Sequence, residues 1–110
     1  MSKTPERTAG PRYTLDRITA FPAIVGDHKD FLCIGGLAGT AKDLASLTND
    51  GANYYGLAGA MGAAVSIGLG LALARPDKQV LVATGDGELL MNIGALATVS
   101  VLNPPNLRIL

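Results

Sequence analysis

Short apolar runs alternate along this chain with longer segments in which apolar residues recur every three or four positions. Uninterrupted runs occupy residues 31–34 and 80–83. Residues 107–110 form an apolar run broken by Arg108, and residues 53–55 form a shorter extended candidate. Runs this short, without polar interruptions, are typical of strands buried on both faces of a parallel sheet. The pattern therefore predicts four strands, separated by segments long enough for helical crossovers.

Helical periodicity predicts helices over residues 15–25, 40–47, 59–74 and 88–99. In the first of these, Thr14 is the expected N-cap, and Pro22 is expected to kink or break the helix. Its expected buried face consists of Leu15, Ile18, Phe21, Ile24 and Val25. Strand, helix and strand in alternation indicate right-handed parallel crossovers. The expected fold class is α/β, with a three-layer arrangement of helices on both faces of a parallel sheet.

The length of 110 residues allows one domain, with residues 1–13 as a polar, flexible lead-in and residues 14–110 as the folded part. Nine basic and nine acidic side chains cancel, so no charge pattern indicates a nucleic-acid partner. A single cysteine, Cys33, and a single histidine, His28, argue against a disulfide framework and a zinc site. We expect a cytoplasmic location.

Residues 56–74 form an uncharged stretch that is long enough to span a membrane. It contains five glycines and six alanines, so bulky apolar side chains are comparatively few. Small residues let a backbone approach a sheet, a cofactor or a partner closely. We therefore favour a buried helix over a membrane helix, and expect no membrane association.

Gly85-Asp86-Gly87 follows the predicted strand at residues 80–83. Asp-Gly can mark a hairpin, but residues 88–99 have helical rather than strand periodicity. A carboxylate between a strand and a helix lies where open parallel sheets bind ligands. Glycines permit close approach, helix N-termini attract phosphate, and Asp86 suits magnesium on a diphosphate.

The sequence does not match either of two common nucleotide-binding motifs. The dinucleotide fingerprint needs a third glycine where this chain has Leu90. The phosphate loop needs Gly-Lys followed by Ser or Thr, which Gly39-Thr40-Ala41-Lys42 does not provide.

Three segments together resemble the diphosphate-binding domain of thiamine diphosphate-dependent enzymes. They are Gly59-Ala60-Met61-Gly62, the small-residue stretch 68–74, and Gly85-Asp86-Gly87-Glu88 with the residues up to Asn92. The likeness extends over residues 15–110. Within the family it points to the beta part of sulfopyruvate decarboxylase and to phosphonopyruvate decarboxylase.

The resemblance implies that Asp86 ligates Mg²⁺ and that Gly87 and Glu88 lie at the diphosphate of thiamine diphosphate. Many relatives have a small residue where this chain has Glu88. Met61 would be an apolar wedge that holds the cofactor bent, and the Gly59 carbonyl would accept a hydrogen bond from the cofactor's amino group. The full set of implied cofactor-binding residues is Gly36, Leu37, Gly39, Thr40, Gly59, Ala60, Met61, Gly85, Asp86, Gly87 and Glu88.

Two parts of the family's site are missing from the sequence. The asparagine that completes the magnesium motif would lie beyond Leu110, because Asn103 and Asn106 precede the last predicted strand. The glutamate that activates the cofactor comes from a pyrimidine-binding domain, usually of a partner subunit. We therefore expect a partial, apparently truncated thiamine diphosphate-binding domain in a homo- or hetero-oligomer, and we assign no catalytic residue in this chain.

The resemblance implies the diphosphate- and Mg²⁺-binding part of a non-oxidative decarboxylase, a lyase acting on a small 2-oxoacid of the sulfopyruvate or phosphonopyruvate type. An acetolactate synthase-like carboligase component and a noncatalytic truncated remnant are the alternatives. Among the remaining residues, His28 is expected in a solvated loop and Cys33 in the core. Tyr54 and Tyr55 are expected to line a substrate pocket or to pack in the core or an interface.

Overall fold

A computed structural model of the chain describes residues 14–110. The elements, in chain order, are α1 (Arg17–Val25), the 3₁₀ turn η1 (His28–Asp30), β1 (Phe31–Gly35), α2 (Gly39–Thr48), β2 (Tyr54–Gly56), α3 (Ala64–Ala74), β3 (Gln79–Ala83), α4 (Asp86–Met91), α5 (Ala95–Leu102) and β4 (Leu107–Ile109). All four predicted strands are present. The predicted lead-in at residues 1–13 lies outside the described part.

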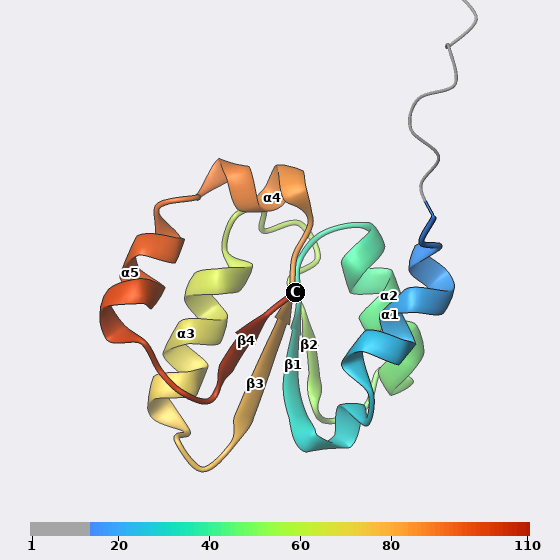
Figure 1. Cartoon of the computed structure of the whole chain (residues 1–110), viewed down its shortest axis with the longest axis horizontal. Helices are drawn as coiled ribbons and strands as arrows, with labels where there is room; N and C mark the ends of the chain where they lie inside the picture. The colour runs from blue at the N-terminus through green and yellow to red at the C-terminus, as the bar shows by residue number, and fades with distance from the viewer. Residues whose placement is uncertain (1–13) are drawn as a thin grey trace, which may run out of the picture.

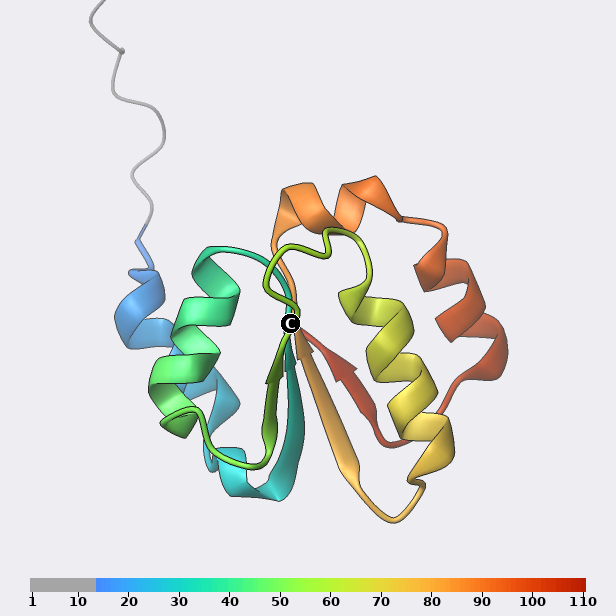
Figure 2. The same ribbon diagram turned by 180° about the vertical axis from the view of Figure 1, so that it is seen from behind.

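The four strands form one parallel sheet in the order β2-β1-β3-β4. Helices α1 and α2 cover one face, and α3 and α5 cover the other, as the two opposite views show (Figures 1 and 2). The short helix α4 lies across the carboxyl ends of the strands (Figure 1). This arrangement confirms the predicted three-layer α/β fold.

Strand β3 supplies the centre of both hydrophobic cores. Val80 and Val82 point to the α3 and α5 side, while Leu81 and Ala83 point to the α1 and α2 side. None of the four is more than 5% exposed. Because both faces of the strand are covered, every position must be apolar, which explains the unbroken run in the sequence.

Helix α3 packs very closely on this strand. A Cβ atom built at Gly68 would overlap Cγ2 of Val82. The small residues therefore serve helix–sheet packing, as predicted. The uncharged stretch 56–74 is divided into the end of β2, a turn and the 11-residue α3. Within residues 14–110, no helix has the length and apolar character needed to cross a membrane.

The predicted first helix is wrong in its cap and in most of its buried face. Helix α1 starts at Arg17, and Asp16, not Thr14, is its N-cap, accepting a hydrogen bond from the backbone N–H of Ile18 at 3.3 Å. Only Phe21 and Val25 are buried, because α1 directs this single i, i+4 pair into the core that also contains Leu44 of α2 and Leu81 of β3. Leu15, Ile18 and Ile24 are exposed. Pro22 lies inside α1 without breaking it.

Two other helix boundaries also differ from the prediction. Helix α3 starts at Ala64 rather than residue 59, because Gly62 adopts a positive φ of 84° that an α-helix cannot contain. The predicted helix at residues 88–99 is split into α4 and α5. The Asn92 side chain, at the end of α4, donates to the Gly62 carbonyl at 3.0 Å and joins the two turns.

Asn106 ties the end of α3 to the start of β4. It is 5% exposed, and its Nδ2 donates to the carbonyls of Ala72 (3.0 Å), Arg75 (3.1 Å) and Lys78 (2.8 Å). These carbonyls lie at and beyond the helix C-terminus, where the helix supplies no further backbone donors; among the three, the Arg75 carbonyl also accepts from the Lys78 N–H at 3.0 Å. Asn106 therefore has a structural role, at the opposite end of the sheet from Asp86.

We expect Asn106→Ala to lower the free energy of unfolding by about 1–3 kcal/mol, because buried carbonyls lose their donor. Asn106→Asp should lower it further, since an acceptor would then face the same carbonyls. Thermal or urea unfolding of both variants measures this. An Asp variant as stable as the natural chain would contradict the assigned role.

Candidate functional site

Three loops meet above the carboxyl edge of the sheet, following β1, β2 and β3. In the register of β1 and β3, Gly35 pairs with Ala83, so the loops after these strands start side by side. Between the loops lies a cleft of about 410 Å³. It is lined by Arg17, Leu37, Ala38, Gly39, Thr40, Met61, Gly85, Asp86, Gly87 and Glu88.

The cleft brings together eight of the eleven residues predicted to bind the cofactor. Gly36 lies directly beneath it, against the Glu88 side chain. Gly59 and Ala60 belong to the turn that carries Met61, but they do not line the cleft. The sequence motifs thus converge in space, although the parts they play in binding remain predictions.

Asp86 is the first residue of α4 and is exposed. Its Oδ1 accepts a hydrogen bond from the Gly87 backbone N–H at 2.8 Å. Cβ atoms built at Gly85 and Gly87 would meet nothing within 4 Å, so both glycines border open space. A strand–turn–helix arrangement here shows that the hairpin alternative is wrong.

Two helices begin at the cleft without a side-chain cap. The N-cap residues are Ala38 for the ten-residue α2 and Gly85 for α4, and neither offers a side-chain hydrogen bond. The first backbone N–H groups of a helix have no partner within the helix. Together with the partial positive charge of a helix N-terminus, they favour an anion at this position.

Ala38 has an unusual backbone conformation, with φ of 57° and ψ of −117°. This region is favoured by glycine, and a residue with a Cβ is strained there. The strain lies at the point where the chain turns from β1 into α2 beside the cleft. Such strain is often retained where a loop must hold a particular shape for binding.

Met61 projects from the loop after β2 into the cleft and is 45% exposed. This exposure distinguishes it from an ordinary core methionine. Its backbone N–H donates to the Gly59 carbonyl at 3.1 Å. A carbonyl oxygen has two lone pairs, so Gly59 can still accept from a ligand.

Glu88 is turned inward and is 4% exposed. Its Oε2 accepts hydrogen bonds from the Leu37 backbone N–H at 2.9 Å and from the Thr84 hydroxyl at 3.1 Å. The side chain thus joins the loop after β1 to the turn after β3. The buried Glu88 carboxylate borders the cleft from below, whereas the Asp86 carboxylate is exposed.

Arg17 and Ala38 line the cleft but are not among the residues predicted from the sequence, and Arg17 comes from a distant part of the chain. The Arg17 side chain also contacts the loop after β1. Its guanidinium lies against Gly39, where the Nη1 atom would be 2.6 Å from an added Cβ. Its Nε is 2.7 Å from Asp43 Oδ2, although that oxygen accepts no hydrogen bond. No local sequence signal links Arg17 to this loop, because the contact depends on how α1 packs on α2.

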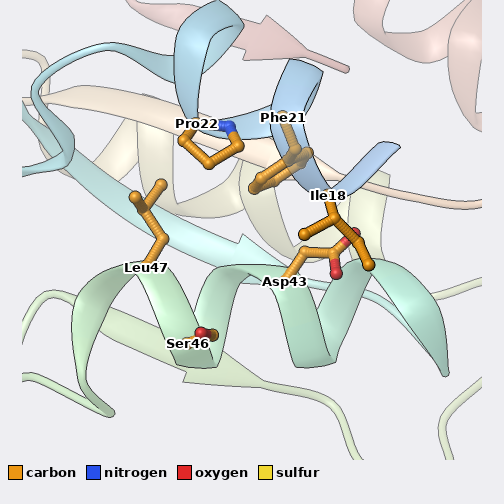
Figure 3. A pocket seen from close by; sticks show the side chains of 6 residues that line it. All are labelled: Ile18, Phe21, Pro22, Asp43, Ser46 and Leu47. Carbon is orange, nitrogen blue, oxygen red and sulfur yellow. The ribbon is translucent and has the colours of Figure 1, made fainter. Parts of the chain in front are cut away.

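A second cavity, of about 300 Å³, lies between α1 and α2. Figure 3 shows Ile18, Phe21 and Pro22 of α1 facing Asp43 and Leu47 of α2. Most of these side chains are apolar, and the carboxylate of Asp43 is already near Arg17. Asp43 and Ser46 are the cavity's two polar lining residues, and no titratable group other than Asp43 lines it.

The remaining candidates lie away from the cleft. Cys33 is 1% exposed in the core, where burial raises the pKa of its thiol to about 11. Tyr54 packs against the same core, and its hydroxyl donates to the Ala41 carbonyl at 3.1 Å. Tyr55 is exposed, and neither tyrosine lines the cleft. His28 lies in η1, at the amino end of β1.

Comparison with known proteins identifies a family for this arrangement. Residues 34–110 match the family described as "Thiamine pyrophosphate enzyme, C-terminal TPP binding domain". Among individual proteins, the chain is 43% identical over 95 residues to the beta subunit of sulfopyruvate decarboxylase from Methanothermobacter thermautotrophicus, which covers 86% of this chain and 50% of the relative.

Two further similarities concern larger enzymes. Phosphonopyruvate decarboxylase from Streptomyces viridochromogenes is 36% identical over 92 residues, covering 83% of this chain and 23% of the relative. The large subunit of acetolactate synthase isozyme 1 from Escherichia coli is 50% identical over only 42 residues, or 38% of this chain and 8% of the relative. The chain thus spans half or less of the length of each of these relatives.

We expect Ala38→Gly to raise the free energy of unfolding by about 1 kcal/mol, because relief of the positive-φ strain exceeds the added entropy of the unfolded chain. Ala45→Gly in the interior of α2 is the control, and it should lower stability by about 0.5–1 kcal/mol. Thermal unfolding measures both changes. A loss of stability in both variants would contradict strain at Ala38.

Proposed function

The chain belongs to the thiamine pyrophosphate enzymes, as their C-terminal cofactor-binding domain, and we propose that it is the diphosphate- and Mg²⁺-binding part of a non-oxidative 2-oxoacid decarboxylase. The observation that carries this proposal is the cleft at the carboxyl edge of the sheet, where Asp86, Met61 and two uncapped helix starts meet. The similarities to sulfopyruvate and phosphonopyruvate decarboxylases support a small anionic 2-oxoacid as substrate.

The residues in the cleft fit a diphosphate with magnesium. The uncapped start of the ten-residue α2 provides backbone donors for phosphate oxygens, whereas the Gly87 N–H at the start of α4 already donates to Asp86. Gly85 and Gly87 leave the space that a diphosphate needs. Asp86 provides one hard carboxylate ligand, and Mg²⁺ commonly takes one or two carboxylates together with phosphate oxygens and water. Residues 14–110 contain no cluster of three His, Cys, Asp or Glu side chains that would hold a metal without phosphate.

The chain's own residues would bind and orient the cofactor rather than transfer protons. Met61 offers an apolar, adaptable surface inside the cleft, suited to shaping a bound ring system. The Gly59 carbonyl provides an acceptor on the same turn. The Arg17 guanidinium adds a positive charge at the mouth of the cleft. When bound, thiamine diphosphate supplies the electron sink that decarboxylation of a 2-oxoacid requires.

We assign the activating glutamate to a pyrimidine-binding domain or partner subunit. Glu88 is the sole glutamate within residues 14–110, and its buried carboxylate is held by Leu37 and Thr84. Beside the cleft, Leu90, Met91 and Ile93 are 67%, 63% and 53% exposed. Exposed apolar residues grouped in this way support a protein partner over the cleft.

A carboligase component resembling acetolactate synthase is the second candidate. The short similarity to the E. coli acetolactate synthase subunit favours it, but that similarity spans 38% of this chain, against 86% for the sulfopyruvate decarboxylase subunit. The two candidates share the diphosphate site and differ in what the cofactor-bound substrate reacts with next. Product analysis therefore separates them.

Replacing Asp86 tests the cofactor site directly. We expect Asp86→Ala to weaken Mg²⁺-dependent binding of thiamine diphosphate by roughly tenfold or more, because the metal loses its protein carboxylate. Titration calorimetry, with the full chain alone and with a candidate pyrimidine-binding subunit, measures the change. Asp30→Ala is the control, since Asp30 is an exposed carboxylate at the amino end of β1. No binding by the natural chain, even with such a partner, would overturn the proposal.

The substrate class is tested with the chain and a pyrimidine-binding subunit together. We expect release of carbon dioxide from sulfopyruvate or phosphonopyruvate, with the corresponding aldehyde as product, and much slower release from pyruvate. The measurement is carbon dioxide release coupled with product identification. Formation of acetolactate from pyruvate as the main product would favour the carboligase instead.

A further inference from the structure

A buried carboxylate lies beneath the cleft with only one of its two oxygens satisfied. Glu88 Oε2 accepts from Leu37 and Thr84, whereas Oε1 is buried and accepts no hydrogen bond from any residue in the described range 14–110. An unsatisfied buried acceptor lowers stability by about 1–3 kcal/mol, more if it is charged. Stability therefore does not explain a glutamate at residue 88. A small residue at this position would avoid the unsatisfied oxygen.

The Glu88 carboxylate occupies the space where a side chain at residue 36 would lie. A Cβ at Gly36 would overlap Oε2 of Glu88, and the three nearest atoms to that position all belong to Glu88. Gly36 does not have a positive φ, so its backbone conformation does not require glycine. The Gly36 N–H donates to the Ala83 carbonyl at 2.9 Å, which holds the start of the loop against β3. Glycine at residue 36 is therefore needed to make room for the side chain of residue 88.

Glu88 and Gly36 connect the two loops that would hold the diphosphate. Leu37, whose N–H is bound by Glu88, directly precedes the strained Ala38 and the uncapped start of α2. Glu88 itself belongs to α4, two residues after Asp86. The hydrogen bond from Leu37 to Glu88 spans 51 residues of sequence and is the one side-chain hydrogen bond between the loop of residues 36–40 and α4.

We propose that Glu88 is a positioning residue, which fixes the loop of residues 36–40 in the shape that receives the diphosphate. The proposal rests on the proposed cofactor site. The Glu88 carboxylate acts through the Leu37 backbone and not by contact with metal or cofactor. A loop already held in its binding conformation loses less entropy on binding, and the affinity is correspondingly higher. The charge on Glu88 would itself repel a diphosphate, so the gain comes from position and not from charge.

Three variants separate position from charge and from simple stability. Glu88→Ala removes the acceptor for Leu37, whereas Glu88→Gln keeps an acceptor oxygen and removes the charge. Gly36→Ala displaces the carboxylate without changing it, and the double variant Gly36→Ala/Glu88→Ala restores the space but not the hydrogen bond. Asp30→Ala again serves as the control for removing an exposed carboxylate far from the cleft.

The first measurement is deuterium exchange of residues 36–40 in the full chain without cofactor. We expect faster exchange in Glu88→Ala and Gly36→Ala, and nearly natural exchange in Glu88→Gln and Asp30→Ala. Adding Gly36→Ala to Glu88→Ala should cause little further change, because the overlap is gone. Equal exchange in all variants would overturn the positioning role. This measurement does not depend on whether the cofactor site exists.

The second measurement is calorimetric titration with thiamine diphosphate and Mg²⁺, with a pyrimidine-binding subunit present if the natural chain requires one. We expect Glu88→Ala to bind roughly tenfold more weakly, because the loop must then be ordered on binding, and Glu88→Gln to remain within about threefold of the natural chain. Faster exchange in Glu88→Ala with unchanged affinity would overturn the inference and leave the cofactor site intact. Equal losses in Gln and Ala would identify Glu88 as a direct ligand and also overturn it. Absence of binding by the natural chain would instead count against the proposed function.

Discussion

The parallel pairing of β1 with β3 is the constraint on which the candidate site depends. Five consecutive residue pairs, from Phe31 with Gln79 to Gly35 with Ala83, fix the two strands so that they end together. The loops that leave them must therefore start side by side, and the loop after β2 joins them from the next strand. The core residues of β3, buried on both faces, hold this register, because a slip by one residue would exchange its two sides.

The same edge concentrates groups that favour an anion and groups that oppose it. Uncapped helix starts, open glycines and Arg17 favour a diphosphate, whereas Asp86 and Glu88 carry charge of the same sign as the ligand. A divalent cation bound by Asp86, as proposed, would offset this repulsion, and Asp86 is exposed in the cleft. Glu88 is kept apart by burial, and its hydrogen bonds lead into the loop of residues 36–40. The charges in the cleft therefore suit a metal–diphosphate complex better than a phosphate group without metal.

The sequence predicted the strands, the layers and the convergence of the site, because each rests on local pattern. The apolar run at residues 80–83 indicates a buried strand, and the glycines around Asp86 indicate a ligand site. Each signal lies within a few residues of sequence. The errors arose where distant contacts decide the outcome. Helix α1 buries only Phe21 and Val25, the one i, i+4 pair that it directs into the core. The helix predicted at residues 88–99 is divided where Asn92 binds Gly62. Arg17 enters the cleft by tertiary packing, which no spacing in the sequence reveals.

Asp86 and Glu88 show how one short helix can give two carboxylates opposite tasks. Residues two apart on an α-helix point about 200° away from each other, so Asp86 and Glu88 reach the cleft from different sides, Asp86 exposed and Glu88 buried. With Asp86 directed into the cleft, residue 88 turns inward, where a small side chain would leave the Leu37 N–H without its acceptor. A glutamate reaches the Leu37 N–H only because Gly36 has no side chain. The identity of residue 36 is thus coupled to that of residue 88, and both follow from the direction in which Asp86 points.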